Sequence, residues 1–166
     1  MNYHPDAEAR VSFLEKMSCG KKCKCKLSVQ LLTPTAKMPS KANPSDAGLD
    51  LYADESGSIY RGERKLISTG ISVAIPEGYV GLIWPRSGLS VRNGISVMAG
   101  VIDAGYRGEI KVCLLNTNQN TDFFKYDKGD KIAQILIQPI LDVNLEQVEE
   151  LPLSDRNEKG FGSSGR

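Results

Sequence analysis

The chain has 166 residues, of which 40% are hydrophobic and 25% charged. This composition is typical of one folded domain with a buried core, and it excludes a fibrous repeat or a wholly disordered chain. The 21 Lys and Arg residues nearly balance the 20 Asp and Glu residues, which leaves a net charge of +1. That balance predicts no stable binding of nucleic acid or of an anionic membrane, so an anionic ligand must be bound by a local site.

The N-terminal segment carries charged residues where a secretory signal would need an apolar run, and no apolar stretch approaches the ~18 residues of a membrane span. We therefore expect an intracellular protein, located in the cytoplasm or, in a eukaryotic cell, also in the nucleus. The four cysteines are then predicted to be thiols, because the cytosol is reducing. The single histidine, His4, excludes mechanisms that need imidazole in a packed site, so acid–base chemistry must come from carboxylates, Tyr, Lys or Cys.

Residues 1–26 form an extension with a composition of its own. Residues 5–17 could begin a short helix, whereas residues 16–26 are rich in lysine and have no apolar face. Three thiols in this extension could bind a metal, but a tetrahedral site needs four ligands and only His4 is spare nearby. We favour a flexible, solvated basic extension over a metal site formed by Cys19, Cys23 and Cys25.

From residue 27 onward, short segments alternate apolar and polar residues and are separated by turn sequences such as 75–78, 103–106 and 127–130. In residues 71–75 and 109–114 the apolar side chains fall on one face, which indicates strands. Further strands are expected near 27–32, 49–53, 64–68, 79–84, 94–102, 121–126, 131–138 and 144–149. About ten short strands without a long helix predict an all-β sandwich, jelly roll or barrel. The edges of such a small sheet domain favour oligomerisation.

Two segments carry polar groups suited to binding an anion. In DAGLDLYA (46–53), Asp50 lies between two leucines and needs a cation, an arginine or backbone donors as partner, unless it simply closes a turn. PRSGLS (85–90) follows an apolar strand and could form one helical turn. Its backbone N–H groups, with Arg86 and Ser87, could bind phosphate oxygens, although so short a motif also fits a plain loop.

AGVIDAGYRGEIKV (99–112) is the most informative segment. Asp103 follows a strand and stands at the mouth of a hairpin, and the aromatic Tyr106 comes three residues later. A carboxylate and a ring at this spacing could surround a small ligand. The alternative is an aspartate that only caps a glycine turn.

The last two segments are less specific. Gln134 lies in the nearly continuous apolar run 128–138, on the face that alternation assigns to Ile132 and Leu136, so its amide must find a hydrogen-bond partner. The segment 156–166 resembles a phosphate-binding loop, but it lacks the P-loop pattern and a following helix.

Taken in order, AGLDLYA, PRSGLS, AGVIDAGYRG, GDKIAQILI and R-x4-F-G-S-S-G resemble the five motifs of the trimeric deoxyuridine triphosphatases, the dUTPases. The resemblance implies an all-β, distorted jelly-roll (β-clip) subunit of a homotrimer, with three active sites at subunit boundaries. It divides the chain into the extension 1–26, a jelly-roll domain 27–150 and a mobile C-terminal arm 151–166 that closes a neighbouring subunit's site. It also implies Mg²⁺-dependent hydrolysis of dUTP to dUMP and pyrophosphate, which keeps uracil out of DNA and supplies dUMP for dTMP synthesis.

The resemblance implies a role for each matching residue. Asp103 would deprotonate the water that attacks the α-phosphorus, and Tyr106 would pack against the deoxyribose and exclude a 2′-hydroxyl. Cytosine would be rejected because it inverts the donors and acceptors of the uracil edge, and thymine because its methyl group finds no space. The main chain that would pair with uracil belongs to Gly100, Val101, Ile102 and Lys111.

The phosphates and the metal complete the implied site. Mg²⁺ would be held mainly by the triphosphate oxygens, and Asp50 would reach it through water. Phe161 would stack over uracil when the arm closes. The groups implied to bind the phosphates are Arg86, Ser87, Gly88, Gln134, Arg156, Gly162, Ser163 and Ser164.

The chain departs from the family pattern at two places. Asn157, Glu158 and Lys159 stand where family arms are richer in glycine, and Gly105 stands where an acidic residue commonly precedes the tyrosine. The second feature also resembles the dCTP deaminases, but Cys113 occupies the place of their catalytic glutamate, which disfavours deamination. Another alternative is a dUTP-responsive trimer that binds a protein partner; only the extension 1–26 hints at it.

Overall fold

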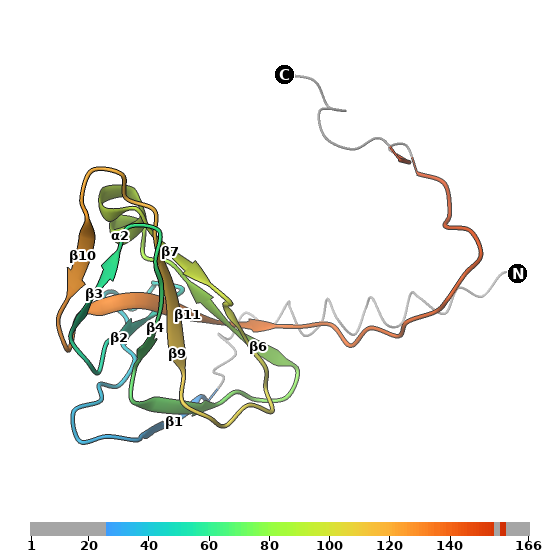
Figure 1. Ribbon diagram of the computed structural model, residues 1–166. Coiled ribbons are helices and arrows are strands. Elements are labelled where there is room, and N and C mark those ends of the chain that lie inside the picture. Colours follow the sequence, from blue (N-terminus) through green and yellow to red (C-terminus); the bar gives the residue numbers. More distant parts are fainter. Residues whose placement is uncertain (1–25, 155–156, 159–166) are drawn as a thin grey trace, which may run out of the picture.

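The computed structural model describes residues 26–154 and 157–158, which fold into short antiparallel strands and one short helix (Figure 1). The predicted all-β class is thereby confirmed. No helix among the described residues is long and apolar enough to cross a membrane. The predicted helix near 5–17 and the thiols of Cys19, Cys23 and Cys25 lie outside the described residues.

Eleven strands are described, and their bounds agree with most of the predicted ones. They are β1 (Ser28–Leu31), β2 (Leu49–Tyr52), β3 (Gly57–Tyr60), β4 (Arg64–Ser68), β5 (Ile71–Ala74), β6 (Tyr79–Trp84), β7 (Ile95–Met98), β8 (Val101–Ile102), β9 (Lys111–Asn116), β10 (Phe123–Tyr126) and β11 (Lys131–Pro139). The helix α2 (Ser87–Asn93) follows β6 and ends at Gly94, which adopts the left-handed conformation of a helix C-cap.

The strands pair in four groups, all antiparallel. The largest is a four-stranded sheet in the order β2-β11-β6-β8, and a three-stranded sheet has the order β4-β9-β7. The remaining pairs are β1 with β5 and β3 with β10. In the large sheet Gln134 on β11 lies opposite Asp50 on one side and Trp84 on the other. This register places the motifs 46–53 and 85–90, which are distant in sequence, on either side of the motif 128–138.

The core is aliphatic and is filled from the alternating strands. Ile71, Val73 and Ile75 are each at most 3% exposed, and Ile110, Val112 and Leu114 are fully buried, as the period-two pattern predicts. Burying such a side chain completely contributes about 1.5–3 kcal/mol. These strands are therefore held rigidly, and the loops that carry the candidate site residues start and end on a fixed frame.

The predicted strand 94–102 is two strands that belong to different sheets. Ala99 between them has φ 52°, in the left-handed region, and this turn takes the chain from β7, which pairs with β9, to β8, which pairs with β6. The strand β3 was not predicted, because Gly57 and Ser58 have low strand propensity.

The predicted strand 144–149 is wrong. Beyond β11 the chain leaves the domain in an extended conformation (Figure 1), after Ile140 N–H donates to the Gly78 carbonyl at 2.9 Å. Leu145 is 95% exposed and Leu153 92% exposed, and this segment pairs with no strand among the described residues.

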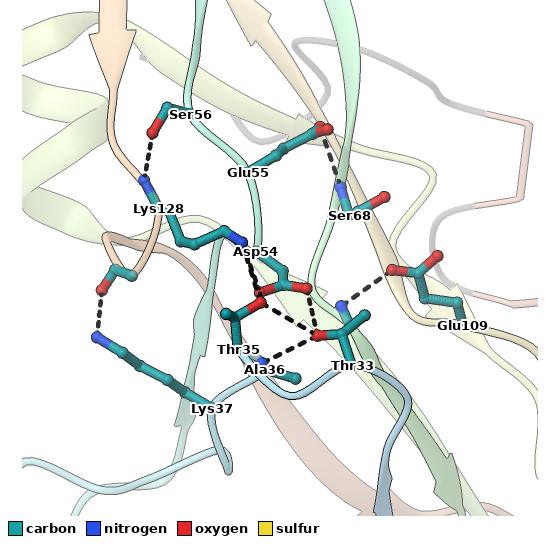
Figure 2. A network of polar contacts seen from close by, with 12 residues as sticks. Thr33, Thr35, Ala36, Lys37, Asp54, Glu55, Ser56, Ser68, Glu109 and Lys128 are labelled. Atoms are coloured by element: carbon teal, nitrogen blue, oxygen red, sulfur yellow. Dashed lines mark hydrogen bonds and ion pairs between the residues drawn. The ribbon is translucent and has the colours of Figure 1, made fainter.

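A polar network ties the loop after β1 to the rest of the domain (Figure 2). The side chain of Asp54, 7% exposed, accepts hydrogen bonds from the hydroxyls of Thr33 at 2.5 Å and Thr35 at 2.7 Å, and Lys128 Nζ lies 3.6 Å from it. The Thr33 hydrogen bond, helped by Thr35 and the Lys128 charge, holds the pKa of Asp54 below its usual value despite burial. This carboxylate therefore stabilises the fold in its charged form.

Candidate active site

A cavity of about 700 Å³ lies where β2, β11, the end of β6 and the start of α2 meet. It brings together three of the predicted motifs, because Asp50, Arg86 and Gln134 all line it. Ser87 and Gly88, at the first turn of α2, line it as well. We call this cavity the phosphate cavity, after the chemistry predicted for its residues.

Asp50 is the electrostatic centre of the phosphate cavity. Its Oδ1 lies 3.1 Å from Arg86 Nε and its Oδ2 lies 2.6 Å from Lys131 Nζ, and its side chain is only 12% exposed. The predicted need for a cationic partner is therefore met twice. The hydrogen bond to Asp50 raises the pKa of Lys131, which keeps this lysine charged. One carboxylate against two cations leaves a local positive excess, which suits an anionic ligand.

Arg86 is positioned from two sides. It is the residue before α2, with an extended backbone (φ −87°, ψ 127°), and its Nη1 donates to the Lys131 carbonyl at 3.2 Å. Its side chain is 36% exposed, so the guanidinium is both anchored on Asp50 and open to the cavity. An arginine held in this way keeps donors free for phosphate oxygens.

The hydrogen-bond partner that Gln134 needs is a backbone carbonyl. Its Nε2 donates to the Pro85 carbonyl at 3.0 Å, which ties β11 to the segment before α2. A Cβ at Gly48 would collide with Gln134 Oε1, so any larger residue there would displace the amide. The expectation that Gln134 shares a face with Ile132 is wrong, because a bulge between Lys131 and Ala133 turns Ile132 into the core while Gln134 and Leu136 line the cavity.

A second cavity of about 590 Å³ is formed by the hairpin 99–112. Asp103 and Tyr106 both line it, as does Lys111, and we call it the hairpin cavity. Tyr106 N–H donates to the Asp103 carbonyl at 3.1 Å, which closes the predicted turn, and Tyr106 Oη donates to the Glu109 carbonyl at 3.0 Å. Asp103 is exposed, and among residues 26–154 its carboxylate has no hydrogen-bond or ion-pair partner.

The backbone beside the hairpin cavity offers free hydrogen-bonding edges. The strand β8, with Val101 and Ile102, is an edge strand of its sheet. Lys111 pairs with Ser68 on β4, but the pairing of β9 with β7 stops at Cys113. Unlike Val101, Ile102 and Lys111, Gly100 does not line the hairpin cavity, and its carbonyl already accepts a hydrogen bond from Ile83 N–H at 2.6 Å.

The two cavities have no lining residue in common. Asp50 belongs to β2 and Asp103 follows β8, and these strands are the two opposite edges of the four-stranded sheet. Three inter-strand spacings separate them by roughly 14 Å. The structure thus brings Asp50, Arg86, Ser87, Gly88 and Gln134 together and places Asp103, Tyr106 and Lys111 apart from them. The predicted arm residues Arg156, Phe161, Gly162, Ser163 and Ser164 lie outside the described residues.

The carboxylates of the phosphate cavity do not form a metal cage. Among the described residues no group of three or more His, Cys, Asp or Glu side chains could hold a metal ion. Asp46 and Asp50 are the acidic residues that line the phosphate cavity, and both oxygens of Asp50 are occupied by cations. This donor set leaves a Mg²⁺ ion to be held mainly by the phosphates of a ligand. That Asp50 contacts the ion through water stays a prediction.

Several residues of the cavities were not predicted. Lys131, the second cation on Asp50, is 81 positions away in sequence and meets it only through the pairing of β2 with β11. Trp84 and Arg92 line the phosphate cavity, and Glu109 lines the hairpin cavity. Arg92 lies six residues after Arg86, in the last turn of α2, and the local sequence pattern does not mark it as a cavity residue.

Known proteins resemble this chain over most of its length. The family model dUTPase matches residues 34–165. The deoxyuridine 5'-triphosphate nucleotidohydrolase of Clostridium tetani is 46% identical over 142 residues, which are 84% of this chain and 97% of that protein. The protein of the same name from Nocardia farcinica is 47% identical over 141 residues, covering 84% of this chain and 85% of its own.

Solved structures agree with the fold. The Staphylococcus bacteriophage 80alpha dUTPase with dUPNHPP superimposes with a TM-score of 0.81 at 35% identity, covering 86% of this chain and all of the phage protein. A mutant dUTPase from phage phi11 of S. aureus, whose structure concerns a structural Mg(II) ion, has a TM-score of 0.71 at 32% identity and covers 76% of this chain and 99% of that one. The predicted jelly-roll fold is confirmed, and the chain belongs to the dUTPase family.

Proposed function

We propose that the two cavities are the two halves of one active site, and that this site performs the reaction of the family. The protein is a dUTP diphosphatase, which hydrolyses dUTP to dUMP and pyrophosphate. The observation that carries the proposal is the division of the motifs: the phosphate cavity holds the cations, whereas the free carboxylate of Asp103 lies in the hairpin cavity. Neither half has both an anion site and a base.

The phosphate cavity binds the triphosphate. Arg86, fixed on Asp50, directs its remaining donors to phosphate oxygens, while Ser87 and the main chain at Gly88 add neutral donors. Gln134 keeps Pro85 in place and so fixes where the arginine starts. Because these groups are held before substrate arrives, little ordering is lost on binding.

The hairpin cavity binds the nucleoside and supplies the base. Asp103 orients and deprotonates the water that attacks the α-phosphorus, which expels pyrophosphate and gives dUMP. Its exposed carboxylate is suited to this task because no cation of the described chain occupies it. The edge of β8 and the main chain of Lys111 pair with the uracil edge, and cytosine would leave those groups unpaired.

Tyr106 selects the sugar. Tyr106 is 45% exposed, and hydrogen bonds fix its backbone N–H and its phenol hydroxyl. The ring lies over Gly108, where a Cβ would collide with the hydroxyl. A ring fixed in this way packs against deoxyribose and leaves no space for a 2′-hydroxyl. UTP is therefore rejected by shape.

The site is completed in a homotrimer, where the phosphate cavity of one subunit faces the hairpin cavity of the next. The arm 151–166 of a neighbouring subunit closes the site: Arg156, Gly162, Ser163 and Ser164 contact the terminal phosphate, and Phe161 stacks over uracil. The extended segment from Ile140 to Ser154, with its exposed leucines, supports this exchange, because it leaves the domain without burying them. Bound Mg²⁺ would neutralise charge on the phosphates and align them, with Asp50 contacting it through water.

The test is pyrophosphate release from dUTP, dTTP, dCTP and UTP, each with Mg²⁺, by the wild type and by Asp103→Asn. Release from dUTP alone, abolished in the variant although dUTP still binds, is the expected result. Release from dUTP that persists in Asp103→Asn would overturn the assignment of the base.

A further inference from the structure

Glu109 is a residue of the hairpin cavity to which neither the sequence motifs nor the mechanism above gives a task. Its side chain is 24% exposed and lines the cavity next to Tyr106 and Lys111. Both of its carboxylate oxygens are engaged: Oε1 accepts from Gly70 N–H at 2.9 Å, and Oε2 lies 3.5 Å from Lys111 Nζ. Figure 2 shows this carboxylate directed at the turn between β4 and β5.

The contacts of Glu109 join the hairpin to that turn. Gly70, with φ +66°, forms the tight turn between β4 and β5, and its N–H is held by the glutamate. Next to it, Ile110 N–H donates to the Ile71 carbonyl at 2.8 Å, and the Thr69 hydroxyl donates to the Ile110 carbonyl. Residues 109 and 110 are thus clamped to residues 69–71, and the glutamate side chain is the member of the clamp that faces the cavity.

Tyr106 depends on this clamp for its position. The phenol hydroxyl donates to the backbone carbonyl of Glu109 at 3.0 Å, and the ring has a close neighbour below it in Gly108. A shift of the Glu109 backbone therefore moves the far end of the ring. Discrimination by shape is sensitive to small displacements, because a ring that retreats by less than 1 Å already admits part of a hydroxyl group.

We propose that Glu109 is a positioning residue that sets discrimination between deoxyribonucleotides and ribonucleotides. It acts through the hydrogen bond from Gly70 N–H, which fixes the Glu109 backbone and with it the ring of Tyr106. This inference rests on the role of Tyr106 given under the proposed function. Glu109 itself contacts neither the sugar nor the phosphate.

The experiment compares kcat and KM for dUTP and for UTP in matched variants. Glu109→Ala removes the acceptor of the Gly70 N–H. We expect it to lower the preference for dUTP, measured as kcat/KM for dUTP divided by kcat/KM for UTP, about tenfold, mainly through a change in KM. Glu109→Gln keeps an oxygen for Gly70 N–H, so its ratio is expected to stay within about threefold of wild type. If Glu109→Ala does not fold, Glu109→Asp, whose carboxylate is one methylene too short to reach, replaces it.

The control for a merely structural role is Glu63→Ala. Glu63 also accepts a backbone N–H in a strand-connecting turn, from Tyr60 at 2.7 Å, but it lines neither cavity. Glu63→Ala should lower the melting temperature about as much as Glu109→Ala does, but it should leave the preference for dUTP over UTP unchanged. The inference is overturned if Glu109→Ala leaves the ratio unchanged, or if Glu109→Gln lowers it as much as Glu109→Ala.

Tyr106→Ala separates the two proposals. If the preference for dUTP over UTP falls in Tyr106→Ala but not in Glu109→Ala, the role of Tyr106 stands and only the role of Glu109 is refuted. An unchanged ratio in Tyr106→Ala refutes both. The combination that supports the inference is a narrowed ratio in both alanine variants and a near-normal one in Glu109→Gln and Glu63→Ala.

Discussion

Asp50 and Asp103 stand at opposite edges of the same four-stranded sheet, one within β2 and the other directly after β8. The intervening strands β11 and β6 hold the two edge strands roughly 14 Å apart. The two residues are also offset along the sheet, because Asp50 aligns through Gln134 with Trp84, whereas Ile102, just before Asp103, aligns with Gly81. A base must come within hydrogen-bond reach of the attacking water, and that water must lie beside a phosphate that Arg86 holds next to Asp50. Within one chain Asp103 is therefore too far from the phosphate held by Arg86 to reach the attacking water. Asp103 of one subunit can meet the phosphate cavity of another subunit without this conflict.

The first prediction is complementation between two inactive variants. Arg86→Ala disables the phosphate cavity and Asp103→Asn disables the hairpin cavity, so each variant alone should be inactive. When equal amounts are unfolded and reassembled together, about a quarter of the sites should combine two intact halves, and pyrophosphate release should recover to that level. Mixing without reassembly serves as the control. No recovery after reassembly would show that both halves come from one chain.

The second prediction concerns the base. Asp103→Asn keeps the size and the turn of the hairpin but removes the group that accepts the proton, so kcat should fall by about 10²- to 10⁴-fold with little change in dUTP affinity. Pyrophosphate release and calorimetric binding of dUTP measure the two effects. The control is Asp122→Asn. The Asp122 side chain is 89% exposed, forms an ion pair with Arg61 and lines neither cavity. A loss of affinity equal to the loss of kcat would instead indicate a binding role.

Much of the fold could be predicted because it depends on local patterns. The alternation in 71–75 and 110–114 set the buried faces, and the turn from Asp103 to Tyr106 followed from its glycine and aspartate. The Asp50–Lys131 pair and the Glu109–Gly70 hydrogen bond could not be predicted, because strand pairing creates them between residues far apart in sequence. Nor could alternation reveal the β11 bulge, since one extra residue shifts every later side chain to the other face.

The third prediction tests how closely Gln134 is packed. In Gly48→Ala the new Cβ would overlap Gln134 Oε1 and push the amide away from the Pro85 carbonyl. The start of the Arg86 segment would then loosen, and KM for dUTP should rise by about tenfold. Steady-state hydrolysis measures this effect. In Gly105→Ala the added Cβ meets no atom within 4 Å, so that variant should keep a wild-type KM; a normal KM in Gly48→Ala would contradict the prediction.

The fourth prediction is a pH dependence of stability that comes from Asp54. Because hydrogen bonds from Thr33 and Thr35 lower the pKa of Asp54 in the folded protein, the unfolded chain takes up the proton first as the pH falls. The contribution is complete well above the unfolded pKa of 3.8 and is lost as the pH falls through the lowered folded value. Asp54→Asn should therefore be less stable than wild type at pH 7 by about 1–3 kcal/mol.

Urea unfolding at a series of pH values from about 7 to 3 measures this difference. The gap between wild type and Asp54→Asn should narrow toward the acid end, because protonation removes the same charge from the wild type. Asp127→Asn is a suitable control, since the Asp127 side chain is 62% exposed and its lysine partner is on the surface. A gap that stays constant across the series would show that the charge of Asp54 does not matter.

The fifth prediction concerns a buried hydroxyl. Tyr126 is 1% exposed, and among the described residues its Oη has no hydrogen-bond partner, although its ring packs in the core and lies 5.8 Å from Lys65 Nζ. Removing an unsatisfied polar group relieves its desolvation, so Tyr126→Phe should be neutral or stabilising by up to about 1 kcal/mol. Tyr52→Phe is the matched comparison, because the Tyr52 hydroxyl shares a 2.6 Å hydrogen bond with Ser40, and it should cost about 0.5–1.5 kcal/mol. Urea unfolding of the two variants measures both values, and a Tyr126→Phe protein less stable than Tyr52→Phe would show that the buried hydroxyl is paired in solution.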